Sequence, residues 1–181
     1  MQHKMYYNLS TLSQMDIYLF KQGSYTKMYE KFGAHPMTHK GKKGVHFAVW
    51  APNAKSVCVR GDFNDYKIDA HPLQLRSDDS GIWEGFIEDI AIGLTYKYHI
   101  VSLFHNIVHE KSDPFAFYSE VAPKSASRIY ELDNYKWNDK KWMEKRYKNN
   151  ACDSPISVYE MHVGSWRRNP LEDNRYLTYK E

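Results

Sequence analysis

The stretch VHFAVWAPNAKSVCVRGDFN, residues 45–64, decides the fold expected for this chain. Within residues 45–50, Val45, Phe47 and Val49 alternate with the other three residues, which is the period-2 pattern of a strand with one buried face. Residues 51–54 carry turn chemistry, because proline fixes φ and asparagine tolerates a left-handed backbone. Alternation resumes over residues 57–59 and stops at the GDFN segment. We therefore predict a β-hairpin, which needs further partner strands to be stable in water.

Short strands are predicted on the carboxyl side of this hairpin, and turn residues separate each from the next. Their expected positions are residues 71–76, 82–88, 94–101, 107–111 and 127–132. Asp113 and Pro114 stop the strand that precedes them, because proline donates no hydrogen bond to a ladder. Short strands at this spacing predict one β-sandwich.

The segment ahead of the hairpin is expected to be mainly helical. Residues 1–9 have the composition of a disordered terminus, and Ser10 or Ser13 is placed to cap a helix. Residues 25–33 indicate a second short helical turn. Residues 34–44 are expected to form an exit loop and a solvated, lysine-rich turn.

The chain changes character after the sandwich. Residues 135–154 are highly charged and show no strand alternation, so we expect a linker there. Residues 156–164 follow a proline as a nearly continuous apolar run, which suits a strand buried on both faces of a parallel sheet. Such a strand has no predicted parallel partner in the sequence. We therefore expect the sequence to be part of a longer protein.

Composition argues against several function classes. Hydrophobic residues make up 42% and aromatic residues 15% of the 181 residues, which supports a packed core. The net charge of +3 is small for a nucleic-acid footprint, so no nucleic-acid partner is expected. The sequence has no apolar run of transmembrane length and no signal-peptide core, so we expect a cytoplasmic protein without a membrane partner. Cys58 lies in a predicted strand, which favours a buried small hydrophobe over a reactive thiol.

A set of motifs occurs in a fixed order along the chain. They are YEKFGAHP (29–36), FAVWAPNAKSV (47–57), GDFN (61–64), SGIWEGFI (80–87), YKYHI (96–100), SDPFAF (112–117) and VYEMHVGSWRR (158–168). With this set the chain resembles the amino-terminal part of bacterial 1,4-α-glucan (glycogen) branching enzymes. WAPNA and GDFN resemble the wider family-48 carbohydrate-binding modules. YEMHVGSW narrows the resemblance to a branching enzyme or a close relative such as a trehalose-releasing hydrolase, and YEKFGAHP favours the former.

The resemblance implies a mainly β fold class and a domain plan. The plan has a helical lead (1–37), an immunoglobulin-like, carbohydrate-binding-type β-sandwich (38–134), a linker (135–154), and the first strand of an incomplete (β/α)8 barrel (155–181). The resemblance also implies that the complete enzyme cuts an α-1,4-glucan and rejoins the severed end through an α-1,6 bond, by a retaining double displacement. The family's catalytic carboxylates lie on later barrel strands. We therefore assign no catalytic residue and no cofactor, and we expect this chain to be inactive alone, with α-glucan and the missing barrel as its partners.

Sugar binding is the chemistry that remains for the chain itself. Aromatic planes stack on the apolar faces of glucose units, while polar side chains bond the hydroxyls. In the wider module family the turn after GDFN usually carries a tryptophan, which some members use as a sugar platform, and Tyr66 stands at that position here. We expect glucan contacts from Tyr66, Asn64, Trp83 and Lys97. For Trp83 and Trp50, which both lie in predicted strands, a core role is the favoured alternative.

The remaining titratable residues are given structural roles. Asp62 and Asp65 flank a turn, where aspartate normally bonds nearby backbone amides, so neither is assigned to catalysis. Glu160 and His162 lie on the presumed barrel strand, where structural contacts are favoured for both. The histidines at positions 35, 39 and 46 lack a second ligand set at metal spacing, so no metal site is predicted.

Two other hypotheses stay open. A stand-alone glucan-binding or regulatory module would account for the sandwich, but it would not need the buried-strand sequence at residues 158–168. A generic interaction sandwich would not need the ordered set of motifs.

Overall fold

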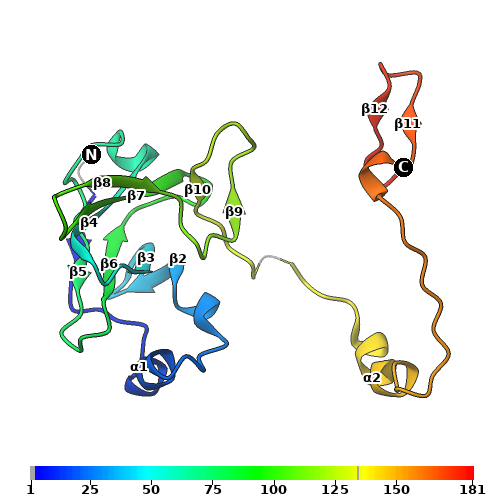
Figure 1. Cartoon of the computed structure of the whole chain (residues 1–181), viewed down its shortest axis with the longest axis horizontal. Helices are drawn as coiled ribbons and strands as arrows, with labels where there is room; N and C mark the ends of the chain where they lie inside the picture. Colours follow the sequence, from blue (N-terminus) through cyan, green and yellow to red (C-terminus); the bar gives the residue numbers. More distant parts are fainter. Residues whose placement is uncertain (1–2, 134) are drawn as a thin grey trace. The chain divides into compact units, whose positions relative to one another are not determined.

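A computed structural model describes residues 3–133 and 135–181. The chain forms two compact units, residues 1–135 and residues 136–181 (Figure 1). The first unit contains two antiparallel sheets and the amino-terminal helix. The second unit contains one helix, one 3-10 turn and a two-stranded ladder. No helix within the described ranges is both long and apolar enough to cross a membrane.

The first sheet has the strand order β1-β6-β3-β2, and β5 also pairs with β6. These strands are β1 (Met5–Tyr6), β2 (Gly33–His39), β3 (Lys42–Trp50), β5 (Gln74–Leu75) and β6 (Ile82–Glu88). Strand β3 lies at the centre and pairs antiparallel with both β2 and β6. Residues 45–50 therefore lie in the middle of this sheet.

The second sheet has the order β4-β7-β10-β9, and β8 also pairs with β7. Its strands are β4 (Ala54–Gly61), β7 (Thr95–Ser102), β8 (Val108–Lys111), β9 (Tyr118–Ser119) and β10 (Ser127–Arg128). The 3-10 helix η2 (Asp62–Asn64) follows β4 directly. Every ladder in this sheet is antiparallel.

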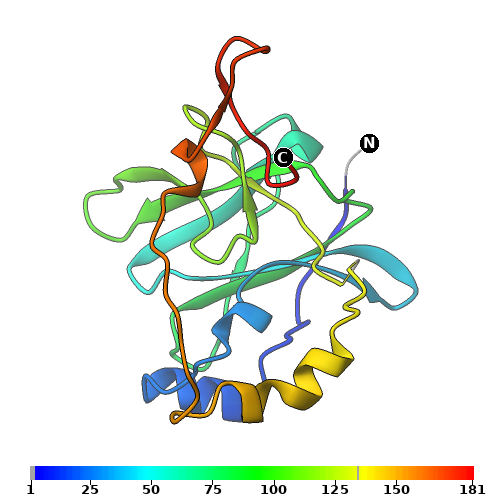
Figure 2. The same ribbon diagram turned by 90° about the vertical axis from the view of Figure 1, so that its right-hand side faces the viewer.

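The two sheets share one hydrophobic core. The rings of Phe47 on β3 and Tyr96 on β7 meet edge to face with their centroids 5.2 Å apart. Both side chains are fully buried. Burial of a large apolar side chain contributes roughly 1.5–3 kcal/mol, so side chains of this kind hold the layers together. The predicted β-sandwich is confirmed (Figures 1 and 2).

The predicted hairpin over residues 45–64 is wrong, although both of its strands exist. Strand β3 belongs to the first sheet and β4 to the second, so the turn between them crosses from one layer to the other. At this turn the amide of Ala51 donates to the carbonyl of Gly81, which lies just before β6. Both strands direct alternate apolar residues into the same core from opposite sides. Alternation alone does not distinguish that arrangement from a hairpin.

The predicted helix is confirmed as α1 (Gln14–Lys21). Ser13 caps it in a reciprocal capping box with Asp16, in which the Ser13 amide donates to Oδ2 of Asp16 at 2.8 Å. The second helical turn is η1 (Met28–Glu30). A separate cluster of buried apolar residues holds α1 to the sandwich: Leu12, Ile17, Tyr25, Phe32 and Ile82.

Three strands of the first unit, β1, β2 and β9, form where none was predicted. Residues 34–39 belong to β2 rather than to a loop, and Pro36 is tolerated because β2 is an edge strand of its sheet. Residues 5–6 form β1, which pairs with β6, so residues 3–9 are not the disordered terminus expected. Residues 1–2 of that prediction lie outside the described residues.

The second unit departs from the sequence expectations. Residues 140–149 of the expected linker form α2 (Lys140–Asn149). No strand forms over residues 156–164, which contain only the start of the 3-10 turn η3 (Val163–Ser165). A parallel strand needs a neighbouring strand and covered faces, and the described part of this unit pairs only β11 (Arg168–Asn169) with β12 (Arg175–Tyr176). Ile156 and Val158 are consequently 86% and 81% exposed.

Candidate functional site

The turn after β4 presents Tyr66 beside β7. Asp65 and Tyr66 both adopt left-handed backbone angles, with φ of 52° and 53°. The carbonyl of Tyr66 accepts a hydrogen bond from Nε of Arg60 at 2.5 Å. This contact ties the end of the turn back to the strand that precedes it.

A short hydrogen-bond relay fixes the Tyr66 ring. Its hydroxyl lies 2.6 Å from Oγ1 of Thr95, and Thr95 donates its own hydroxyl proton to Oδ2 of Asp62 at 2.8 Å. Because the Thr95 proton is committed to Asp62, Tyr66 donates to Thr95. Partial burial raises the pKa of Tyr66, so the hydroxyl stays protonated and keeps this role. The half-buried ring is therefore held in one orientation at the surface.

Lys97 lies two residues along β7 from Thr95, so both side chains share the outer face of the second sheet. Its Nζ donates to Oγ of Ser125 at 2.9 Å. The same face carries Glu110, which bonds Arg60 and lies 2.6 Å from Nδ1 of His99. Tyr66 and Lys97 thus belong to one polar surface, which we call the β4–β7 face.

Asn64 and Trp83 are not on that surface. Asn64 is buried, and its amide bonds the amide of Gly61, the carbonyl of Val59 and Nδ1 of His71. Trp83 is 7% exposed, and its indole donates to the carbonyl of Ala51 at 3.0 Å. Asn64 holds the turn after β4, and Trp83 packs in the core. Their burial removes both from the surface available to a sugar.

Trp50 behaves differently from Trp83. The favoured core role for Trp50 is wrong, because its side chain is 55% exposed at the end of β3. Its indole donates to the carbonyl of Ser80 at 3.1 Å, which fixes the ring plane. The sequence does contain a signal for this exposure. Trp50 is the last strand residue before a proline-containing turn, and a strand leaves the core at such a turn.

Trp50 borders a groove of about 480 Å³, which we call the Trp50 groove. Its lining is mostly apolar and comes from the α1 region, the end of β3 and two loops: Phe20, Lys21, Gly23, Tyr25, Met28, Phe32, Trp50, Ser80 and Phe115. The size lies within the roughly 300–1,000 Å³ of small-molecule pockets. An exposed, fixed indole beside a few polar groups is suited to the apolar face of a sugar ring.

Of the two carboxylates singled out in the turn, Asp62 accepts a backbone amide as predicted, whereas Asp65 makes an exposed ion pair instead. Oδ2 of Asp62 accepts the backbone amide of Thr95 at 2.7 Å. Asp65 is exposed and pairs with Lys67 at 3.5 Å. Neither is placed beside a second carboxylate for acid–base work. Within the described ranges, no three side chains of the metal-binding types are grouped so that they could hold an ion.

Glu160 and His162 lie in the second unit and are both exposed. Nδ1 of His162 lies 2.6 Å from Oγ of Ser165, so the expected hydrogen bond is present. The expected packing of His162 is absent, because the strand that would have buried it does not form.

A family profile and curated sequences match this chain. The family described as Carbohydrate-binding module 48 (Isoamylase N-terminal domain) matches residues 31–116. The 1,4-alpha-glucan branching enzyme of Aquifex aeolicus is 48% identical over 95% of the chain, and that of Saccharophagus degradans is 46% identical over 98%. The chain spans only 27% and 24% of the length of these two relatives.

Solved structures agree on the fold. An amylase-family protein from Salmonella typhimurium superposes with a TM-score of 0.53 over 75% of this chain and 20% of that chain, at 20% identity. At this identity the likeness shows the fold alone.

Proposed function

This chain corresponds to the amino-terminal part of the bacterial 1,4-α-glucan branching enzymes, and we propose that its sandwich binds α-1,4-glucan chains. The observation that carries the proposal is the exposed Trp50 indole, fixed by Ser80 at the border of an apolar groove. Glucose units present flat C–H faces ringed by hydroxyls, and an indole plane covers such a face. Lys21, which is exposed at the groove, supplies a polar group for the hydroxyls.

The β4–β7 face is a second contact area in this proposal. Tyr66 offers a smaller aromatic plane than a tryptophan, and Lys97, two residues from Thr95, offers an ammonium group that also bonds Ser125. Thr95 and Asp62 hold the ring, so little side-chain entropy is lost when a sugar stacks on it. Asn64 and Trp83 have no place in this proposal, because both are buried.

We propose binding, and not catalysis, as the role of the chain on its own. The resemblance places the catalytic carboxylates of branching enzymes on later barrel strands. The stand-alone module remains the alternative. The exposed apolar side chains of Ile156, Val158 and Tyr159 favour the branching enzyme, because a free module has no use for them, whereas a following barrel would cover them.

A cytoplasmic location fits the same proposal. Cys58 and Cys152 are both free thiols, as is usual in a reducing compartment.

Isothermal titration with maltoheptaose tests the binding proposal. We expect Trp50→Ala and Tyr66→Ala each to weaken binding roughly two- to tenfold, because an aromatic contact contributes about 0.5–1.5 kcal/mol. Trp142→Ala is the matched control, since Trp142 is also 55% exposed but lies in α2. Absence of heat with the unaltered chain, or equal losses in all three variants, would refute glucan binding by these surfaces.

An iodine-staining assay with amylose tests the proposal that the chain alone does not catalyse branching. We expect no loss of colour with the chain alone. Branching by this chain would contradict the assignment of catalysis to the later barrel strands.

A further inference from the structure

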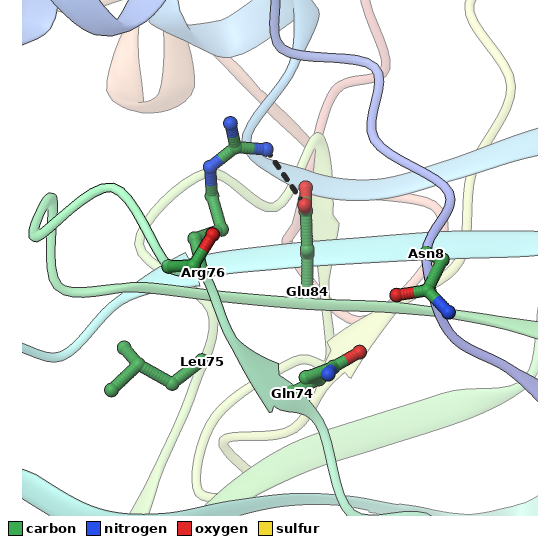
Figure 3. Close-up of a pocket in the computed structure, with 6 residues that line it drawn as sticks. Asn8, Gln74, Leu75, Arg76 and Glu84 are labelled. Atoms are coloured by element: carbon green, nitrogen blue, oxygen red, sulfur yellow. Dashed lines mark hydrogen bonds and ion pairs between the residues drawn. The ribbon is translucent and has the colours of Figure 1, made fainter.

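A small pocket lies on the outer side of the first sheet, and it shares no lining residue with the Trp50 groove. It is formed where the segment after β1 passes β5 and β6, and its volume is about 190 Å³ (Figure 3). The lining residues are Asn8, Gln74, Leu75, Arg76, Ser77 and Glu84. This volume is below the roughly 300–1,000 Å³ of pockets for drug-sized ligands, so the pocket suits a single ring.

The charged residues of the pocket are paired with one another. Arg76 bonds Oε1 of Glu84 at 2.7 Å and Oδ2 of Asp78 at 2.8 Å. Oε2 of Glu84 also accepts the hydroxyl of Ser10 at 2.9 Å. Two carboxylates face the one guanidinium, so no positive charge is left for an anion. The chemistry of the pocket therefore favours an uncharged ligand.

The polar groups that remain available are two side-chain amides. Asn8 comes from the segment after β1 and Gln74 from β5, and neither amide bonds any residue within the described ranges. Both are exposed and point toward the same space in Figure 3. Each amide carries two donor hydrogens and an acceptor oxygen, which matches the mixed donor and acceptor character of sugar hydroxyls.

Leu75 also lines the pocket, but its side chain points away from the two amides (Figure 3). The strand pairing explains this, because Gln74 pairs with Glu84 and Leu75 with Trp83, so Gln74 and Leu75 lie on opposite faces of β5. The two neutral amides are therefore the groups that a hexose would bond here.

We propose that this pocket binds one glucosyl unit of an α-1,4-glucan, as a site separate from the Trp50 groove and the β4–β7 face. The site rests on the proposed function for the class of its ligand. Asn8 and Gln74 hold the hydroxyls, and the ion pair of Arg76 and Glu84 forms the adjoining wall of the pocket. The pocket also joins the amino-terminal segment to the sandwich, so ligand binding should hold that segment in place.

Side-chain amide NMR signals of the ¹⁵N-labelled full chain, titrated with maltotriose, test this site. We expect the Asn8 and Gln74 NH₂ signals to shift, with a saturation curve that differs from that of the Trp50 indole signal. Gln74→Ala should raise the maltotriose dissociation constant measured at the Asn8 signal about fivefold to tenfold, because one hydrogen-bonding group is lost. The dissociation constant measured at the Trp50 signal should stay unchanged. Ser77→Ala is the matched control, because it alters an exposed pocket residue without removing an amide.

The outcomes separate this site from the proposed function. Shifts at Trp50 and Tyr66 with none at Asn8 and Gln74 would overturn the pocket and leave glucan binding intact. Shifts at Asn8 and Gln74 alone would support the pocket and refute the two aromatic surfaces. Shifts nowhere would refute both. If signals far from β5 change in Gln74→Ala, the fold is disturbed and Gln74→Glu takes its place in the test. Gln74→Glu keeps the shape of the side chain and removes its donor.

Discussion

The hydroxyl of Tyr66 lies 2.6 Å from Oγ1 of Thr95, and this contact links the surface aromatic ring of the turn after β4 to strand β7. Thr95 in turn is held by Asp62 through both its amide and its hydroxyl. The orientation of the surface ring is therefore set by a strand residue and a turn carboxylate, neither of which needs to touch a ligand.

Removing the Thr95 hydroxyl tests this relay. Thr95→Val keeps the β-branched shape but leaves Tyr66 without its acceptor, so the ring gains freedom. We expect maltoheptaose affinity to fall roughly two- to threefold, a smaller effect than that of Tyr66→Ala, because the stacking plane remains. Calorimetry on both variants measures the difference. A Thr95→Ser chain keeps the hydroxyl and should bind as the unaltered protein does, and equal losses in the Val and Ser variants would contradict the relay.

Gly81 controls the position of Trp50. It has a left-handed φ of +74°, and an added Cβ would lie 2.7 Å from Cβ of Pro52 and 3.3 Å from the Trp50 indole nitrogen. Gly81→Ala should therefore displace the turn after β3 and disturb the bond from Trp50 to Ser80. We expect a loss of stability of about 1–3 kcal/mol from backbone strain and the clash together, with weaker binding at the Trp50 groove. Urea unfolding and calorimetry measure the two effects.

Gly93 provides the matched control for that substitution. Its φ is +93°, and an added Cβ would have no neighbour within 4 Å. Gly93→Ala therefore introduces backbone strain without a clash. Equal destabilisation by the two substitutions would show that contact with Pro52 does not matter.

The sequence predicted the sandwich and α1 because local patterns determine them. Alternation locates β3, β6 and β7, and the Ser13–Asp16 pair marks the start of the helix. It did not show that β3 and β4 lie in different layers, since both bury one face in the same core. Pro36 concealed β2, because a proline argues against a strand unless the strand lies at an edge.

The candidate site was partly predictable. The resemblance to carbohydrate-binding modules singles out Tyr66 after the GDFN turn, and its ring is partly exposed in the structure. Trp50 and Trp83 have the same residue type and similar strand contexts, yet one is 55% and the other 7% exposed. The difference arises from where each strand leaves the core, which depends on tertiary packing. The pocket at Asn8 and Gln74 joins segments far apart in the sequence, so no local pattern marks it.

The burial of His46 leads us to expect that the protein loses stability in acid. It is fully buried on β3, its Nε2 lies 3.3 Å from the carbonyl of Leu9, and its Nδ1 has no partner among the described residues. Burial lowers the pKa of His46 to about 4, with smaller contributions from the positive charges of His35, Arg76 and Lys31. The unfolded chain has a histidine pKa of about 6.5.

The difference between these two pKa values makes the protein less stable in acid. Between pH 6.5 and 4 the unfolded chain binds a proton at His46 that the folded chain does not. The contribution of the neutral, buried ring to stability is therefore complete above pH 6.5 and is lost as the pH falls toward 4, by a total on the order of 3 kcal/mol. Urea unfolding at pH 7.5, 6 and 5 should show this slope. His46→Asn removes the titrating group, and an unchanged slope in that variant would assign the effect to other residues.

The structure of the second unit leads us to expect early proteolysis at particular sites. Residues 155–162 form no helix or strand, and Ile156, Val158 and Tyr159 are mostly exposed, whereas Phe86 on β6 is fully buried. Backbone that lacks ladder hydrogen bonds opens at low cost, while cleavage in β6 requires the sandwich to unfold. Limited chymotrypsin treatment of the chain should therefore cut at Tyr159 and Trp166 well before it cuts within residues 33–128. Mass spectrometry of the early fragments identifies the sites. Protection of residues 152–168 equal to that of the sandwich would mean that this segment has found a partner, in this chain or in a second copy. The proposed need for a following barrel would then fail.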